Sequence, residues 1–236
     1  MTYTYLINII LLINSILFYT KQDMILVEGN ERISSFYLDI REVTMEEYAS
    51  FVEDTGYITY CEKNNSGLIF APSYEIVSGV NWRHDITGKP IPKKFYKVYP
   101  VTRLTMADIE AYTKWAGKRL PTKEEWIFAA KGGIYTKNYK YVGGNNPRKL
   151  GWFDNNSGER RKPVSTLKPN ELGLYDMGGN VSELVTQKND SIVEWLGGSF
   201  FDDKDFFQLE SIHNGWKSSM KNFNTPFGGF RCAKDL

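Results

Sequence analysis

Residues 170–184 read Asn-Glu-Leu-Gly-Leu-Tyr-Asp-Met-Gly-Gly-Asn-Val-Ser-Glu-Leu. The carboxylates of Asp176 and Glu183 and the amide of Asn180 flank the glycine pair at 178 and 179. Because glycine adopts positive φ without steric cost, the chain can fold back here and bring these oxygens close to the loop's own carbonyls. Hard oxygen donors with no His or Cys nearby suit calcium better than zinc or copper. One interpretation is therefore a calcium-binding loop, although its spacing differs from that of an EF-hand.

The same residues allow a second interpretation without an ion. Asn180 followed three residues later by Glu183 is also the pattern of a helix N-cap and its reciprocal N3 partner. Asp176 would then be an ordinary turn residue. The residues alone fit both interpretations equally well.

Length and composition limit the class of protein. A chain of 236 residues can bury a sizeable core, and because no linker is visible we expect one domain over residues 23–236. Lys and Arg number 29 against 28 Asp and Glu, so the basic excess of a nucleic-acid-binding protein is absent. The aromatic content of 15% and the 20 glycines predict a loop-rich fold packed around large side chains.

The first residues differ from the rest of the chain. Residues 6–19 are largely apolar and carry no charge. This length is short for a membrane-spanning helix and typical of a signal-peptide core, so we expect residues 1–22 to be a signal peptide or membrane anchor of an exported protein. Any membrane contact would be made through this segment only. A buried strand is the alternative, since no basic residue precedes the run and no small-x-small cleavage site follows it.

Cysteine and histidine are too scarce to suggest a site on their own. Cys61 and Cys232 are the only cysteines, and a disulfide between them and two buried thiols are equally compatible with the sequence. His84 and His213 are far apart in sequence and do not form a metal-binding pattern.

The regular elements are expected to be few and short, in a mixed α+β arrangement. Three helices are predicted to start after threonine caps, at Thr44, Thr105 and Thr122. Apolar and aromatic runs predict strands at 24–27, 35–39, 192–195, 198–201 and 230–232. The stretches 62–99 and 141–168 are predicted to be loops and turns.

Eight segments in order resemble the domain of the formylglycine-generating enzyme, or sulfatase-modifying factor, family. They are FYLDIREVT (36–44), GVNWRH (79–84), YPV (99–101), WAGKRLPTKEEW (115–126), AAKGG (129–133), GLYDMGGNVSE (173–183), GGS (197–199) and GFRCA (229–233). The resemblance implies an α+β fold of low regular content, related to C-type lectin-like modules and usually exported. Active members of this family oxidise a cysteine of a sulfatase to formylglycine with copper held by two cysteines.

The resemblance also implies a structural calcium site. Its ligands would be the side chains of Asp176 and Glu183 and the backbone carbonyls of Gly179 and Val181. The family's second calcium site would fall within residues 152–166, where no ligands can be placed.

The chain departs from the family where the chemistry takes place. Residues 199–231 contain no cysteine, and by direct count Phe207 and Ile212 stand at the copper-binding positions. Thr113 replaces the usual disulfide partner of Cys232, and Ser182 and Leu184 replace two tryptophans. We therefore expect no catalytic residue and no copper.

The expected function is a non-catalytic binding protein on this scaffold, with a peptide, glycan or protein partner bound between the Trp82 region and the C-terminal loops. One alternative is an oxidoreductase of the formylglycine-generating type or with altered chemistry. Another is a structural component of a secretion or motility complex. Five aromatic residues of the C-terminal loops belong to the core or to the binding surface: Phe200, Phe201, Phe206, Phe207 and Trp216.

Overall fold

The fold consists of three small sheets, a few short helices and long connecting loops. The computed structural model describes residues 24–186, 193–220 and 222–236, so the predicted leader 1–22 lies outside the described residues. One sheet has the order β1 (Met24–Val27), β2 (Phe36–Asp39), β9 (Ala233–Asp235), with antiparallel pairing throughout. This low regular content agrees with the predicted α+β class.

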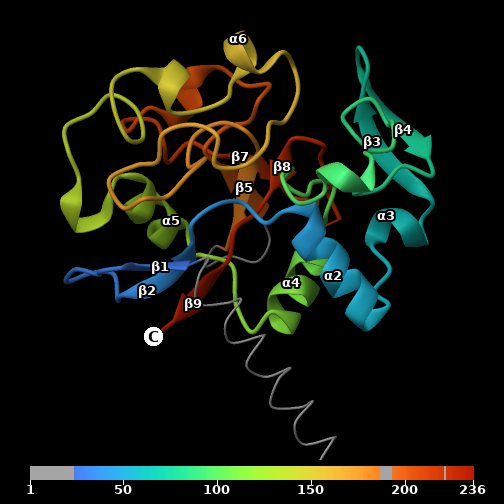
Figure 1. Cartoon of the computed structure of the whole chain (residues 1–236), viewed down its shortest axis with the longest axis horizontal. Coiled ribbons are helices and arrows are strands. Elements are labelled where there is room, and N and C mark those ends of the chain that lie inside the picture. The colour runs from blue at the N-terminus through green and yellow to red at the C-terminus, as the bar shows by residue number, and fades with distance from the viewer. Residues whose placement is uncertain (1–23, 187–192, 221) are drawn as a thin grey trace, which may run out of the picture.

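The central sheet has four strands and joins distant parts of the chain. Its order is β7 (Trp216–Ser218), β6 (Val193–Leu196), β5 (Ser182–Val185), β8 (Gly228–Gly229), and β5 pairs with β8 in parallel. A separate hairpin is formed by β3 (Ser66–Phe70) and β4 (Tyr74–Ser78). In Figure 1 the β1-β2-β9 sheet lies at the lower left, the hairpin at the upper right, and β5 between them.

The three longer helices begin where the sequence predicted. They are α2 (Met45–Thr55), α4 (Met106–Trp115) and α5 (Lys123–Ala130). Each has a threonine N-cap whose hydroxyl accepts from the N3 amide, and the N3 carboxylate accepts from the cap amide. This reciprocal bonding satisfies backbone donors that the first turn of a helix leaves unpaired. Two single-turn helices, α3 (Tyr60–Lys63) and α6 (Asp154–Ser157), complete the α-helices of the described residues.

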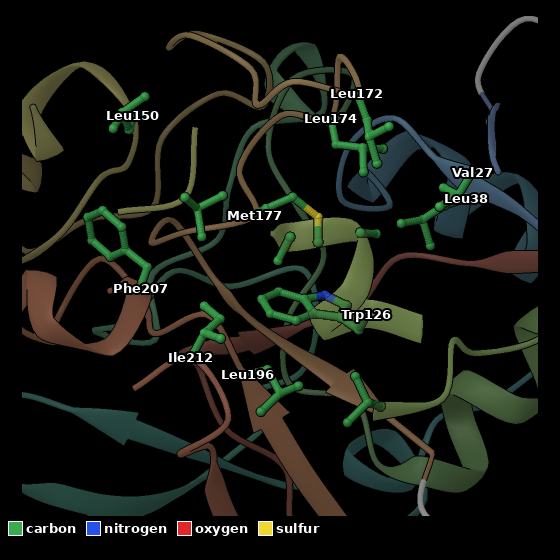
Figure 2. Packing of buried hydrophobic residues seen from close by; sticks show 14 of the residues in the cluster. Val27, Leu38, Trp126, Leu150, Leu172, Leu174, Met177, Leu196, Phe207 and Ile212 are labelled. Carbon is green, nitrogen blue, oxygen red and sulfur yellow. The ribbon is translucent and has the colours of Figure 1, made fainter. Parts of the chain in front are cut away.

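One hydrophobic cluster surrounds Trp126 of α5, whose side chain is fully buried. Met177 of the 170–184 stretch and Leu196 of β6 pack around this indole, and Phe207 and Ile212 lie in the same cluster (Figure 2). A second cluster packs α2 against α4 through aromatic rings, with Tyr48 and Tyr112 stacked at 5.7 Å between centroids. Large aromatic and aliphatic side chains in these two clusters therefore form the core of a fold that has little regular structure.

Several predicted elements differ in the structure. Residues 198–201 form a turn rather than a strand, because Gly197 and Gly198 both have positive φ and bend the chain. Residues 230–232 lie between β8 and β9 and bond irregularly to the 39–43 segment, through Asp39 N to Cys232 O and Val43 N to Phe230 O. The predicted strand 192–195 is β6, with residue 192 outside the described residues.

The region 62–99 is more ordered than predicted. It contains part of α3 and the whole β3–β4 hairpin. The hairpin was missed because its alternation is weak: β4 is mostly exposed on both faces, and Ile76 projects into solvent. Within the described residues, no helix is long and apolar enough to cross a membrane.

Candidate functional site

The loop that carries Asp176, Asn180 and Glu183 turns sharply and then enters β5. Asp176 and Asn180 have left-handed φ values of 55° and 59°, a conformation that Asp and Asn adopt more readily than most residues. The residues after Asn180 form a strand, not a helix. The helix-capping interpretation of Asn180 and Glu183 is therefore wrong.

Position 179 requires glycine for two reasons: its φ is positive, and a side chain there would clash with a neighbouring segment. Its φ is +76°, and a Cβ atom there would lie 2.2 Å from the carbonyl oxygen of Trp152. The loop lies close to this neighbour because Asn180 N donates to Trp152 O at 2.8 Å, while Gly179 N donates to Gly197 O at 2.9 Å. Any side chain at 179 would separate the 152 and 180 segments.

Glu183 is held in a buried ion pair. Its Oε1 accepts from Arg231 Nη2 and its Oε2 from Arg231 Nε, both at 2.6 Å. Trp126 Nε1 donates to the same Oε2 at 2.6 Å. Both charged partners are almost completely buried. Arg231 also donates to the carbonyls of Asp39 and Tyr175, so it connects three separate chain segments.

Two more buried carboxyl groups lie near Glu183. One is Asp176, and the other is Glu42, which the sequence did not indicate. Asp176 Oδ2 accepts from Ser165 N at 2.6 Å. Glu42 is completely buried, and its two oxygens accept from Asn180 Nδ2 and Val181 N at 2.7 and 3.0 Å. The sequence signal for Glu42 is weak, because it directly precedes a capped helix and looks like a surface charge.

These carboxylates are poorly compensated. Burial raises the pKa of Asp176 to about 6, and Glu183 adds to the rise while Ser165 and Arg231 oppose it. Burial also raises the pKa of Glu42 well above its usual range, with the charges of Asp176 and Glu183 as further causes. Of the three buried carboxyl groups only Glu183 bonds to a guanidinium, that of Arg231, while Arg41 acts on Asp176 and Arg161 on Glu42 only across space. Carboxyl groups that lack a directly bonded counter-charge would favour an additional cation.

The predicted calcium ligands fit a cation in kind and charge. Asp176 and Glu183 lie in one buried region, and the carbonyls of Gly179 and Val181 belong to the same turn. Glu183 already accepts three bonds, but carboxylate oxygens offer about four lone-pair sites, so one remains for a metal. The described residues contain no group of three or more His, Cys, Asp or Glu side chains arranged to hold a metal. A site here would therefore depend on backbone carbonyls.

A large cleft opens elsewhere on the surface, with a volume of about 850 Å³. Its apolar wall includes Phe70 of β3 and Phe201 after the Gly-Gly-Ser turn. Its charged wall includes Lys89, Arg160 and Arg161. The partner was predicted to bind between the Trp82 region and the C-terminal loops. Trp82 itself is buried, but residues of the segment that follows it and of the C-terminal loops line the cleft: Asp85, Ile86, Thr87, Lys89, Ile91, Phe200 and Phe201.

The aromatic residues of the C-terminal loops divide between core and surface. Phe200 and Phe207 are buried, and Phe206 is half-buried. Phe201 lines the cleft and also a smaller adjoining hollow that includes Trp216, which is 46% exposed. The core interpretation is therefore confirmed for Phe200 and Phe207, whereas a binding role for Phe201 and Trp216 stays a prediction.

Comparison with known proteins now identifies the scaffold. The sulfatase-modifying factor enzyme 1-like domain matches residues 17–236. The chain belongs to this family. The match begins inside the segment 1–22 that was predicted to be a signal peptide or anchor.

Relatives in the family have different described roles. The formylglycine-generating enzyme of Streptomyces coelicolor is 27% identical over 86% of this chain and 79% of its own length. The chaperone protein LppX of Paenibacillus barcinonensis is 30% identical over 92% of this chain and 86% of its own. The inactive C-alpha-formylglycine-generating enzyme 2 of Mus musculus is 27% identical over 85% and 75%.

Solved structures show the same fold. CarF aligns with a TM-score of 0.62 and 22% identity over 86% of this chain and 87% of its own. PvdO from Pseudomonas aeruginosa aligns with a TM-score of 0.63 and 20% identity over 86% and 81%. At this level of identity they support the fold alone, and they confirm the predicted fold class.

The two cysteines of this family member are buried thiols with raised pKa values. Cys61 and Cys232 are both buried and are not joined in a disulfide. Burial, with Asp108 nearby, raises the pKa of Cys61 to about 12, and burial together with Asp39 raises the pKa of Cys232 well above its usual value. Both groups therefore stay protonated at neutral pH.

We predict that Asp176 makes folding stability depend on pH. Because its folded pKa of about 6 exceeds the value of 3.8 for an unperturbed Asp, its contribution is complete below about pH 4 and is lost as pH rises through 6. Asn suits the left-handed backbone and keeps the bond from Ser165. Measured by urea unfolding with chelator present, Asp176→Asn should gain stability relative to wild type between pH 4 and 6, by roughly 3 kcal/mol at most.

The exposed Asp54 of α2 supplies the control for this experiment, because its side chain lies in solvent near the end of the helix. Asp54→Asn should show no such pH-dependent difference from wild type. A constant difference between Asp176→Asn and wild type across this range would contradict the burial of an ionising group at 176.

Proposed function

We propose that this chain is a non-catalytic binding protein of the sulfatase-modifying factor family, and that the cleft lined by Phe70, Lys89, Arg160 and Phe201 holds a peptide, glycan or protein partner. The observation that carries this proposal is a cleft of about 850 Å³ with both apolar and charged walls. A relative described as a chaperone and another described as inactive show that formylglycine generation is not the only described role in the family.

The cleft is held in shape before any partner arrives. Arg103 donates to the carbonyls of Leu68 and Asp85, and so joins the β3–β4 hairpin to the 85–91 segment. Ser157 Oγ donates to Phe200 O at 2.6 Å and joins α6 to the opposite wall. A preformed site loses less entropy on binding, which favours recognition.

Substitution of Phe201 tests the location of the binding site. Phe201→Ser removes the apolar side chain shared by the cleft and the adjoining hollow, whereas Tyr135→Ser removes an exposed ring that lines neither. Native mass spectrometry of protein purified from its own host should find a partner on wild type and Tyr135→Ser and lose it on Phe201→Ser. Equal retention by Phe201→Ser, with an unchanged melting temperature, would contradict the proposed location.

The proposal also holds that the protein does not convert cysteine to formylglycine. The chemistry implied by the family needs a soft copper site made by two thiolates, and residues 199–231 contain no cysteine. Phe207 and Ile212, at the positions predicted to replace those cysteines, are buried in the core.

Incubation with Cu(I), oxygen and a Cys-x-Pro-x-Arg peptide should therefore give no thiol-to-aldehyde conversion by mass spectrometry. The Streptomyces coelicolor formylglycine-generating enzyme is the positive control. Turnover by this chain that survives Cys61→Ser with Cys232→Ser would show that the chemistry does not need thiolates.

We further propose calcium as a structural ion at the 176–183 loop, with the Asp176 and Glu183 side chains and the Gly179 and Val181 carbonyls as ligands. This is supported by the burial of Asp176 and Glu42, neither of which forms an ion pair among the described residues, beside the Glu183–Arg231 pair. Calcium that binds only the folded state should raise the melting temperature. At a calcium concentration one hundred times its Kd, it would add about 2.7 kcal/mol to the free energy of unfolding.

Asp176→Ala should abolish the calcium-dependent rise in melting temperature, while Asp54→Ala, which removes an exposed carboxylate of α2, should retain it. A wild-type melting curve that is the same with calcium and with chelator would contradict the site and leave Arg231 as the counter-charge of the loop.

Export is proposed from the uncharged run at residues 6–19. Fractionation of the native host should place the protein outside the cytoplasm. Recovery of the full-length chain as a soluble cytoplasmic protein would contradict export.

A further inference from the structure

Two arginines behind the cleft are buried and, among the residues that the structure describes, form no ion pair with a carboxylate. Arg103 is fully buried and donates to the carbonyl oxygens of Leu68, His84 and Asp85. Arg161 donates to Pro100 O, to Thr102 Oγ1 and, at 3.0 Å, to His84 O. All of these acceptors are neutral oxygens. The shared acceptor at His84 places the two guanidinium groups close together.

This arrangement leaves positive charge at the base of the cleft. Burial lowers the pKa of Arg103 to about 9, with the charge of Arg161 as a second cause, and burial lowers the pKa of Arg161 to about 10. Both groups therefore remain charged at neutral pH. Asp85 acts on both arginines, and Glu42 on Arg161, only across space and without an ion pair. Buried charges in proteins are normally paired, so two adjacent cations bonded only to neutral oxygens favour a further anion nearby.

The mouth of the cleft adds to this charge. Lys89 and Arg160 are exposed and line it together with Arg161. Two carboxylates, Asp85 and Glu159, also line the cleft. Asp85 Oδ1 already accepts from Thr87 N, Thr87 Oγ1 and Lys89 N, so this carboxylate is engaged in closing its own turn. Three cations thus face two carboxylates in the cleft, and the smaller hollow adds one more carboxylate, Asp202, whose Oδ2 accepts from Ser199 N and Ser199 Oγ. With Arg103 behind the cleft, four cations face three carboxylates.

The other wall is aromatic and continues beyond the cleft. Phe201 lines both the cleft and the smaller hollow, where Tyr74 and Trp216 are 57% and 46% exposed. The rings are strongly inclined to one another: Phe70 and Phe201 at 67°, Phe70 and Tyr74 at 72°. Inclined rings form notches for apolar side chains rather than a flat platform for a sugar ring. A ligand that spans both hollows must be extended.

We propose that the cleft selects an extended acidic peptide segment that also carries a large apolar side chain. Its Asp or Glu residues would lie against Lys89, Arg160 and Arg161, and its apolar side chain against Phe201 and Trp216. This inference rests on the proposed function, because it names the class of partner that the cleft takes.

Selection from a library of random 12-residue peptides tests the inference with the full chain as bait. Peptides enriched on wild type are kept if they lose binding to Phe201→Ser, and their affinities are measured by fluorescence anisotropy. We expect the kept peptides to be net acidic with an aromatic or large aliphatic residue. Replacement of their Asp and Glu by Asn and Gln should weaken binding at least tenfold.

A matched pair of double variants locates the charge. Lys89→Gln with Arg160→Gln should weaken binding of the acidic peptides at least tenfold. Lys114→Gln with Lys234→Gln removes the same charge from exposed positions outside the cleft and should leave the affinity unchanged. Equal loss in both double variants would overturn selection by the cleft.

The remaining outcomes separate the two proposals. Kept peptides that are neutral or basic would overturn the acidic-peptide inference and leave the cleft as a binding site. Binding of sulfated heparin fragments at the cleft in preference to every peptide would also overturn it. If neither peptides nor these fragments bind in a way that depends on Phe201, the proposed function of the cleft fails together with the inference.

Discussion

The buried ion pair between Glu183 and Arg231 is the interaction on which the rest of the structure depends. It joins β5 to the segment before β9, and Trp126 Nε1 attaches α5 to the same carboxylate. Arg231 further bonds Asp39 O and Tyr175 O. Removal of one partner of such a pair typically costs about 3–5 kcal/mol, because the other charge stays buried without compensation. A fold with so little regular structure needs fixed points of this kind, since most of its backbone polar groups lie in loops.

Hydrogen bonds connect the segment that carries this ion pair to the residues around the cleft. Glu183 fixes β5, and the residues just before it bond to two aromatic segments beside the cleft: Phe200 N donates to Asn180 O, and Ser182 N donates to Phe227 O. Phe200 and Phe227 pack together beside Phe201. The buried carboxylates and the cleft are thus parts of one connected structure. This connection explains how the scaffold can persist in a chain without the family's cysteine pair, because the ion pair serves the fold rather than the chemistry.

The sequence predicted those features that local patterns determine. Threonine caps located α2, α4 and α5, and eight ordered motifs indicated the family. The β3–β4 hairpin was missed because Ile76 and its neighbours on β4 are exposed, so the apolar alternation that marks a strand is weak. Glu42 and the pairing of Arg231 with Glu183 could not be inferred from spacing, since their partners are distant in sequence. The charge behind the cleft was hidden for the same reason: only the fold brings Arg103 and Arg161 to one carbonyl.

If the Glu183–Arg231 pair fixes this structure, its two members must act together in folding. A double-mutant cycle with Glu183→Gln and Arg231→Met, read as free energies of urea unfolding, measures that coupling most directly. We expect each single variant to lose several kcal/mol and the double variant to lose far less than their sum, with a coupling energy of about 2 kcal/mol or more. Additive losses would contradict the account, because the two side chains would then stabilise the fold independently.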